Sequence, residues 1–136
     1  VVEGNFLGTD ATGTKPVGND AGVSLGLDSG LAIIGGATPV ARNVISGNTY
    51  AGIMDDLFRT GAPPATLPAV LVEGNFIGTD VTGQHSIGNK YGILSNGPSL
   101  QIGGTTTAAR NVVSGNEIGV TLQVPAVSRQ QLSESE

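Results

Sequence analysis

The chain has 136 residues, a length typical of a single domain. It contains 22 glycines but only three Phe and two Tyr, so it has few of the aromatic rings that usually fill a globular core. Its net charge of -5 and its six scattered basic residues argue against nucleic-acid binding, which needs a concentrated basic face. Cys is absent, which excludes disulfides and thiolate metal sites, and no apolar stretch approaches the ~20 residues that span a bilayer.

Short strands of three kinds are predicted along the chain, because brief apolar runs alternate with turn residues such as Gly and Asn. The first kind covers residues 1–3, 31–34, 70–73 and 100–102. The second kind has an Asn at its head, and the third kind begins with Gly and covers residues 22–25, 52–55, 92–95 and 119–122. Helix is disfavoured, because no segment keeps a helical period for three turns and Gly, Thr, Val and Asn are poor helix formers.

The chain repeats itself after about 70 residues. Val1-Val2-Glu3-Gly4-Asn5-Phe6 corresponds to Leu71-Val72-Glu73-Gly74-Asn75-Phe76, and Arg42-Asn43-Val44-Ile45-Ser46-Gly47-Asn48 corresponds to Arg110-Asn111-Val112-Val113-Ser114-Gly115-Asn116. A tandem repeat with small insertions between constant strands is typical of a stacked solenoid. We therefore predict an all-β parallel β-helix with three short strands per coil and about three and a half coils, right-handed by the rule for parallel crossovers.

The β-helix is predicted to form a single domain over residues 1–123, followed by a polar tail or linker at residues 124–136. Within the domain, the longest loop is expected at residues 56–68, where three prolines prevent ladder pairing. Because the chain opens in the middle of the repeat pattern, we expect it to be a mature or excised piece of a longer protein.

Stacked coils would place equivalent residues in columns. Two predicted columns are aliphatic, namely Val23, Ile53, Ile93 and Val120, and Leu7, Ile45, Ile77 and Val113. A third column consists of Asn5, Asn43, Asn75 and Asn111, whose amides can pair from coil to coil at the ~4.8 Å strand spacing. A fourth column, Leu25, Asp55, Ser95 and Leu122, breaks the apolar pattern. Either its middle strands end early or a bend turns Asp55 and Ser95 outward, and the sequence leaves both possibilities open.

Two stretches together resemble a known family. Ile34-Gly35-Gly36 followed by residues 41–48, and Gly74-Asn75-Phe76-Ile77-Gly78-Thr79-Asp80-Val81-Thr82-Gly83, are similar to the right-handed parallel β-helix repeats of large secreted or surface proteins of bacteria and archaea. The resemblance covers residues 1–123 and implies an extracellular or cell-surface location. The wider β-helix class includes pectate lyases, polygalacturonases, phage tailspikes and adhesins. This sequence lacks the cluster of acidic and basic residues that marks the catalytic members.

The only tight group of charges is Asp55, Asp56 and Arg59, beside the proline-rich loop. Loops on rigid scaffolds often carry function, so a metal or sugar site is one interpretation and a solvated strand end is the other. His85 is the only His and has no second ligand at a fixed spacing, which argues against a catalytic or metal role. We predict no cofactor and no metal site.

Three residue types recur at equivalent places and have two interpretations each. Asp10 and Asp80 could bind Ca²⁺ or a sugar, but two coils separate them by about 10 Å, and each could instead cap its own turn. Arg42 and Arg110 could clamp an acidic polysaccharide or hydrogen-bond to the next coil. The repeated Phe6 and Phe76 could stack on sugar rings or pack between coils.

The sequence favours a non-catalytic structural module over an enzyme, because it repeats along its length without one distinctive polar cluster. The open ends of a β-helix invite strand addition, so the expected partners are other copies of the chain or flanking repeats, joined end to end into a fibre or stalk. The alternative function is a domain that binds or degrades polysaccharide through a groove beside residues 56–68.

Overall fold

The structure is a computed structural model, and it describes residues 1–26, 31–56, 70–97 and 100–123. Its named strands form three parallel sheets. The first sheet contains β1 (Phe6–Leu7), β4 (Val44–Ile45), β7 (Phe76–Ile77) and β10 (Val112–Val113). The second contains β2 (Ala21–Leu25), β5 (Ala51–Asp55), β8 (Tyr91–Ser95) and β11 (Ile118–Leu122). The third contains β3 (Ala32–Gly35), β6 (Val70–Glu73) and β9 (Leu100–Ile102), and Val2 adds a parallel bridge to Ile34.

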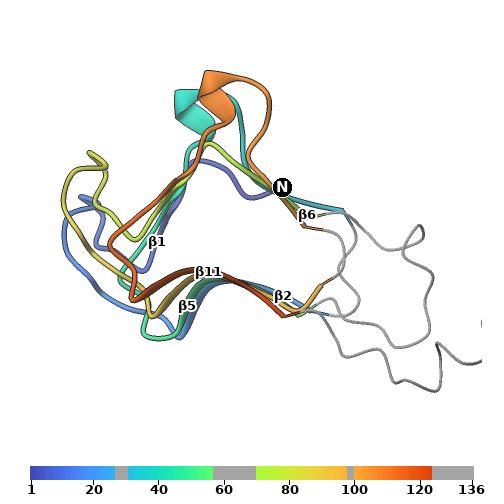
Figure 1. Cartoon of the computed structure of the whole chain (residues 1–136). Helices are drawn as coiled ribbons and strands as arrows, with labels where there is room; N and C mark the ends of the chain where they lie inside the picture. Colours follow the sequence, from blue (N-terminus) through green and yellow to red (C-terminus); the bar gives the residue numbers. More distant parts are fainter. Residues whose placement is uncertain (27–30, 57–69, 98–99, 124–136) are drawn as a thin grey trace, which may run out of the picture.

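The chain visits the three sheets in turn, so the predicted parallel β-helix with three strands per coil is confirmed. Figure 1 looks along the stack, and equivalent strands lie over one another around a shared interior. We call the successive levels coil 1 (residues 1–25), coil 2 (32–55), coil 3 (70–95) and coil 4 (100–122). Because Val2 supplies the third side of coil 1, the stack has four levels, in agreement with the predicted number of about three and a half.

The core includes the predicted aliphatic columns, together with Leu25 and the third-sheet residues Ile34, Val70 and Val72. Val23, Ile53, Ile93 and Val120 are paired in register, as are Leu7, Ile45, Ile77 and Val113. In coils 2 and 3 these side chains are fully buried, whereas the column members in coils 1 and 4 are partly open. Each buried aliphatic side chain contributes roughly 1.5–3 kcal/mol, which explains how a stack with few aromatic rings is held together.

The coils alternate between two designs. Coils 1 and 3 carry loops closed by the bridges Thr9↔Pro16 and Thr79↔Ser86, and these loops touch across coil 2, where the Val81 N–H donates to the Gly13 carbonyl at 2.9 Å. Coils 2 and 4 carry 3-10 turns instead, η1 (Pro39–Ala41) and η3 (Thr107–Ala109). Figure 1 shows the paired loops at one corner and the paired 3-10 turns at another. The 70-residue sequence repeat is therefore a two-coil structural repeat.

The 3-10 turns were not predicted. Each begins after a Thr whose hydroxyl accepts the N–H of an Ala three residues later, at 3.3 Å for both Thr38 and Thr106. No α-helix occurs in the part of the chain that the structure describes, as the sequence indicated. The predictions for residues 57–68 and for the tail at 124–136 lie outside the described residues.

Candidate functional site

The predicted asparagine column forms a continuous ladder. The Asn43 side-chain oxygen accepts hydrogen bonds from the backbone N–H and the side-chain amide of Asn5, at 3.0 and 3.2 Å. Asn75 accepts the same pair from Asn43, at 3.3 and 2.9 Å, and Asn111 accepts it from Asn75, at 3.0 and 3.2 Å. In coils 2 to 4 the amide also donates to a carbonyl of the preceding coil; that of Asn43 reaches Val2 O at 2.9 Å. The ladder thus satisfies the buried polar groups of one corner.

A second ladder, not predicted, lies at another corner and consists of Asn19, Asn48, Asn89 and Asn116. Its geometry is the same: Asn89 Oδ1 accepts the backbone N–H and the side-chain amide of Asn48, at 3.0 and 2.9 Å. The repeated Gly-Asn dipeptides were a visible signal of it. Its equivalence across coils was obscured because coils 1 and 3 insert a loop between their two ladder residues and coils 2 and 4 do not.

Both ladders have a direction. In coils 2 to 4 every ladder oxygen accepts from the preceding coil. Coil 1 therefore presents the oxygens of Asn5 and Asn19, and coil 4 presents the backbone N–H groups of Asn111 and Asn116. Within the described ranges, these four groups have no hydrogen-bond partner. The two ends of the stack are therefore chemically complementary, one with acceptors and the other with donors.

Asp80 closes its own loop. Its Oδ1 accepts the Thr82 hydroxyl at 2.6 Å and the backbone N–H groups of Thr82 and Gln84 at 3.1 and 3.2 Å, and its Oδ2 lies 2.8 Å from Nδ1 of His85. These hydrogen bonds, that of the Thr82 hydroxyl above all, hold the pKa of Asp80 well below its ordinary value of 3.8. The carboxylate is buried, whereas the His85 ring is mostly exposed. The capping interpretation therefore accounts for Asp80.

Asp10 makes the equivalent contacts in coil 1. Its Oδ1 accepts the Thr14 N–H at 3.1 Å and the Thr12 hydroxyl at 2.8 Å. The Thr14 N–H, followed by the Thr12 hydroxyl, lowers the pKa of Asp10 below 3.8. Position 15 is Lys in this loop, where coil 3 has His85, so the side-chain contact to Oδ2 is specific to coil 3.

The two repeated arginines have different surroundings. The Arg42 Nε donates to the Gly74 carbonyl of coil 3 at 3.1 Å, and its guanidinium lies 4.2 Å from the centre of the Phe76 ring. This arrangement is a hydrogen bond to the next coil combined with a cation–π contact. Arg110 occupies the same position in coil 4, where no further coil is described, and it lines a hollow of about 610 Å³.

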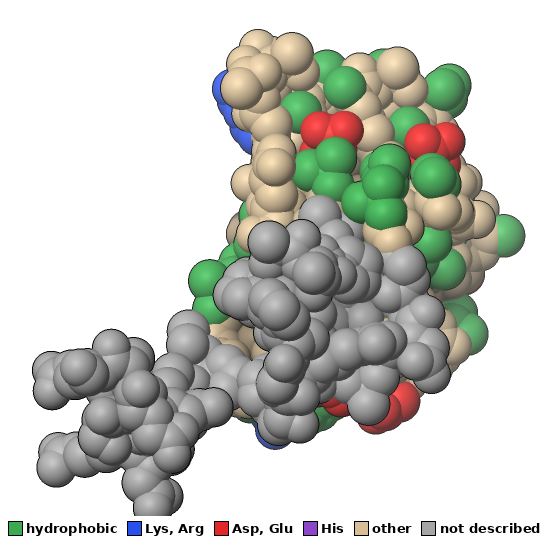
Figure 2. Space-filling view, turned by 90° about the vertical axis from the view of Figure 1, so that its right-hand side faces the viewer, with side chains coloured by type: hydrophobic (Ala, Val, Ile, Leu, Met, Phe, Trp, Pro, Cys, Tyr) green, Lys and Arg blue, Asp and Glu red, His purple; other side chains and the backbone are tan. Residues whose placement is uncertain are grey.

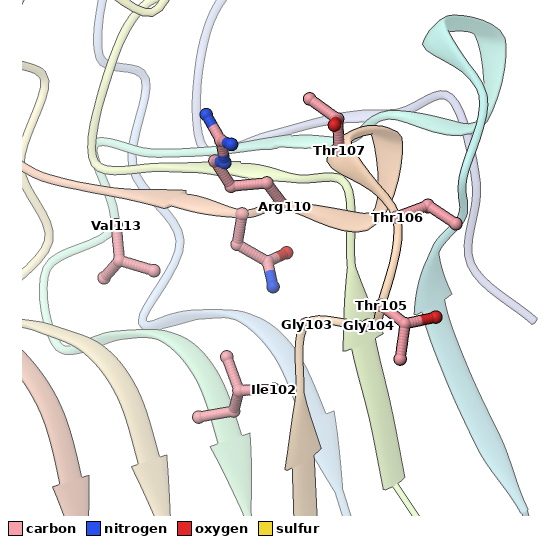
Figure 3. Close-up of a pocket in the computed structure, with 9 residues that line it drawn as sticks. Ile102, Gly103, Gly104, Thr105, Thr106, Thr107, Arg110 and Val113 are labelled. Carbon is pink, nitrogen blue, oxygen red and sulfur yellow. The ribbon is translucent and has the colours of Figure 1, made fainter.

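That hollow is the open face of coil 4. Figure 3 shows Ile102, Val113 and Arg110 around it, together with Thr107 of η3 and the two threonines before it. In coils 1 to 3 the same space is covered by the coil that follows. The hollow therefore marks a level of the stack that no described residue covers, and its lining combines the apolar Ile102 and Val113 with Arg110.

The interrupted column resolves in a way that neither sequence-based alternative anticipated. β5 and β8 continue through Asp55 and Ser95, and both side chains are buried, with the Ser95 hydroxyl donating to Asp55 Oδ2 at 2.6 Å. Beside them, the Asn96 amide donates to Asp56 Oδ1 at 2.5 Å, and Asn96 Oδ1 is buried without a partner. This polar cluster adjoins residues 57–69, and Arg59 lies outside the described residues, so the predicted grouping with Arg59 stays a prediction.

The remaining surfaces are of ordinary kinds. Figure 2 shows the side of the molecule near the third sheet, where hydrophobic side chains lie beside acidic ones. Leu71 and Glu73 are half-buried there and alternate with the core residues Val70 and Val72. Among the described residues, no three His, Asp or Glu side chains are grouped closely enough to hold a metal ion. No helix in the same part of the chain is long and apolar enough to cross a membrane.

The most regular feature of the described residues is thus the pair of complementary end faces, and the most irregular is the cluster of Asp55, Asp56, Ser95 and Asn96. The first follows from the repeat and the second departs from it. Comparisons of the chain with models of protein families, with characterised proteins and with solved structures gave no significant match. The parallel β-helix architecture therefore rests on the strand topology and the two asparagine ladders alone.

Proposed function

We propose that this chain is a non-catalytic structural module of an extracellular or cell-surface protein, serving as a stiff element of a stalk or fibre. In this proposal it belongs with the β-helix repeat proteins of bacteria and archaea that its sequence resembles. The observation that carries the proposal is that the recurring polar side chains are engaged in holding one coil to the next.

Several residues that could have faced a ligand have intramolecular roles. Arg42 is held by Gly74 and Phe76, and Asp10 and Asp80 are held by their own loops. In an enzyme, some of these groups would instead converge on a reacting atom. Their engagement within the stack supports a scaffold.

Stiffness follows from the way that neighbouring coils are joined. Coils 2 and 3 share three parallel strand pairs, two asparagine rungs and the arginine contact. In a solenoid most contacts of a coil are with its neighbours, so strong neighbour contacts make a rod that resists bending. Such a rod suits a spacer between an anchored end and an exposed end.

The polar cluster supports the second candidate, a domain that binds or degrades polysaccharide. Asp55 is a buried carboxylate in a column that is otherwise apolar at Leu25 and Leu122, and Asn96 carries an unpartnered buried oxygen. Polar groups of this kind are more costly than apolar ones unless they have a role. Asp55, Asp56 and Arg59 would provide the ligand contacts of such a site, and Arg42 and Arg110 would be weaker candidates.

Incubation with acidic and neutral polysaccharides, each with and without Ca²⁺, separates the two functions. The structural proposal expects no shortening of the polymer and no binding by calorimetry. Depolymerisation or saturable binding that Asp55→Asn and Asp56→Asn abolish would overturn it and establish the polysaccharide function. Gln84→Ala is the matched control, since this exposed residue lies in the loop between β7 and β8, at the opposite end of β8 from the polar cluster.

A further inference from the structure

We propose that coil 4 of one copy stacks on coil 1 of a second copy, head to tail, and that this junction reproduces the one between coils 2 and 3. The inference rests on the proposed structural function and names a second copy of the chain as the binding partner. It comes from the two-coil period, because coil 4 repeats coil 2 and coil 1 repeats coil 3. The proposed contact therefore already occurs once inside the molecule, as the junction between coils 2 and 3.

The internal junction is held by side chains from both coils. Arg42 contacts the Phe76 ring and the Gly74 carbonyl. The Ser46 hydroxyl donates to the Thr79 carbonyl at 2.7 Å and accepts the Gly78 N–H at 2.9 Å. At the loop, the Gly47 N–H donates to the Ile87 carbonyl at 2.7 Å.

Coil 4 carries the donor side of that junction. Arg110, Ser114 and Gly115 occupy the positions of Arg42, Ser46 and Gly47. Asn111 and Asn116 add the ladder N–H groups that lack partners in the described part of the chain. The Arg, Ser, Gly and Asn residues that coil 2 uses toward coil 3 at these two corners are thus repeated on coil 4.

Coil 1 carries the complementary side. Gly4, Phe6, Gly8 and Thr9 occupy the positions of Gly74, Phe76, Gly78 and Thr79. The ladder oxygens of Asn5 and Asn19 point away from coil 2 and match the N–H groups of coil 4. In the stacked pair, Arg110 of one copy would lie on Phe6 of the other, as Arg42 lies on Phe76.

The exposure of equivalent residues agrees with a missing neighbour. Ile87 is 9% exposed beneath coil 2, whereas its counterpart Val17 in coil 1 is 69% exposed. Ile53 is fully buried, whereas Val120 in coil 4 is 44% exposed. These apolar side chains would be covered by the partner copy, and hydrophobic burial would therefore favour association.

Glycine spacing at the second sheet indicates how closely the copies must approach. A Cβ on Gly22, Gly52 or Gly92 would lie 2.8, 2.6 or 2.5 Å from the carbonyl oxygen of the following Gly in the column. A Cβ on Gly119 would meet only a Val113 methyl at 4.0 Å. Gly119 is therefore unconstrained within its own copy, but a stacked partner would place the Gly22 carbonyl against it.

The direction of the ladders determines the symmetry of the assembly. Two coil 4 faces would oppose donors to donors, and two coil 1 faces would oppose acceptors to acceptors. Only the head-to-tail arrangement pairs donors with acceptors. Such a contact is heterologous and does not close on itself along a straight axis, so it leads to linear chains of copies.

Association of the 136-residue protein tests the inference. Sedimentation at protein concentrations up to about 1 mM should show reversible linear oligomers, and Gly119→Ala should weaken the association by about tenfold or more, because the added methyl clashes across the junction. Gly26→Ala is the matched control, since the other coils already carry side chains at that position and nothing lies within 4 Å of it. A strict monomer throughout, or equal association by the Gly119→Ala variant, would overturn the proposal.

A disulfide test establishes the direction of stacking. Thr121 of coil 4 would lie in register with Ser24 of the partner, as Met54 lies in register with Leu94. The chain has no Cys, so Ser24→Cys and Thr121→Cys proteins each carry one thiol. Their mixture should form the mixed disulfide faster than either protein forms its own dimer, because strands ~4.8 Å apart lie within disulfide range. If the Thr121→Cys protein formed its own disulfide dimer as fast as the mixture formed the mixed disulfide, that result would contradict head-to-tail stacking.

Failure of this inference differs from failure of the proposed function. A protein that stays monomeric and does not cleave or bind polysaccharide would still be a structural module, without the proposed junction. A protein that depolymerises polysaccharide would contradict the structural function whether or not it stacks. Circular dichroism of each variant confirms that loss of association does not come from loss of folding.

Discussion

At the scale of single residues, this fold depends on asparagine side chains that act as part of the backbone network. A corner of a coil has N–H and C=O groups that no strand ladder pairs, and each buried group left unpaired costs about 1–3 kcal/mol. Asn has an acceptor and two donor hydrogens in one short side chain, so one residue satisfies groups of its own coil and of both neighbours.

Truncation of an interior rung should therefore be costly. Asn75→Ala removes the acceptor for Asn43 and the donor for the Ile34 carbonyl in a fully buried place, and we expect a loss of about 2–4 kcal/mol in the free energy of unfolding. Asn111→Ala should cost about 1 kcal/mol, since water reaches this half-exposed rung. Urea unfolding measures both, and equal losses would contradict the role of burial.

The loop carboxylates predict acid sensitivity. The pKa of Asp80 is lower in the folded protein than its ordinary value of 3.8, so ionised Asp80 stabilises the fold at pH values above that value. The stabilisation is lost as the pH falls below about 4. Between pH 7 and pH 3 the melting temperature of the wild-type protein should therefore fall further than that of the Asp80→Asn variant. The Asp10→Asn variant provides the equivalent comparison for coil 1. Parallel losses in all three proteins would show that other groups dominate.

At the scale of the strand, alternation indicates which side chains face the core but not whether a polar one can be tolerated there. Asp55 and Ser95 stay on the inward face because the ladders of β5 with β2 and β8 continue through them. Their hydrogen bond provides part of the compensation that a buried carboxylate requires. A bend in two adjacent strands would instead have broken several ladder hydrogen bonds.

Removal of the hydroxyl tests this account. Ser95→Ala withdraws a donor from a buried carboxylate, and we expect a loss of about 1–3 kcal/mol of stability. Replacement of both residues by Leu restores the apolar column and should be close to neutral or stabilising. Thermal unfolding of the single and double variants measures the difference. If the double variant lost twice as much stability as Ser95→Ala, the other contacts of Asp55 would contribute more to stability than its hydrogen bond with Ser95.

A glycine pair measures the effect of a neighbouring coil on one turn. Gly35 and Gly103 both have a positive φ, 85° and 81°, so Ala costs about 1–2 kcal/mol at either place through backbone strain. At Gly35 the new Cβ would also clash with the Glu73 carbonyl, whereas at Gly103 the nearest atom is 3.9 Å away. Gly35→Ala should therefore destabilise the protein by several kcal/mol more than Gly103→Ala in a denaturant titration.

At the scale of the whole molecule, a solenoid is stabilised by contacts between neighbouring levels, so its end levels are the weakest. Coils 2 and 3 are covered on both sides, whereas the apolar side chains Val120 and Leu122 of coil 4 are exposed. Stacking of a second copy would change an end level into an interior one. The low stability of an end coil and the association of two copies would then both result from the same exposed end face.

Amide exchange should detect this gradient. In dilute monomer, the amides of β11 should exchange about tenfold or more faster than those of β5, because local opening is easiest at an uncovered end. Raising the protein concentration should slow exchange in β11 and leave β5 unchanged if the copies stack. Exchange in β11 that is as slow as in β5 at every dilution would show that the end level is already fully stabilised.

The sequence by itself determined the repeat, the three strand kinds, the aliphatic columns and the first asparagine ladder, because stacking makes residues equivalent whenever they recur at a constant offset. Only the tertiary structure decided that Asn19, Asn48, Asn89 and Asn116 form a second ladder, that Asp55 and Ser95 are buried together, and that Arg42 lies on Phe76. The second ladder spans insertions of different length, which hide the equivalence that its repeated Gly-Asn dipeptides signal. The other two contacts join unlike residue types, which periodicity does not pair. They depend on the distance between coils and the direction of each side chain, which the three-dimensional path of the chain sets.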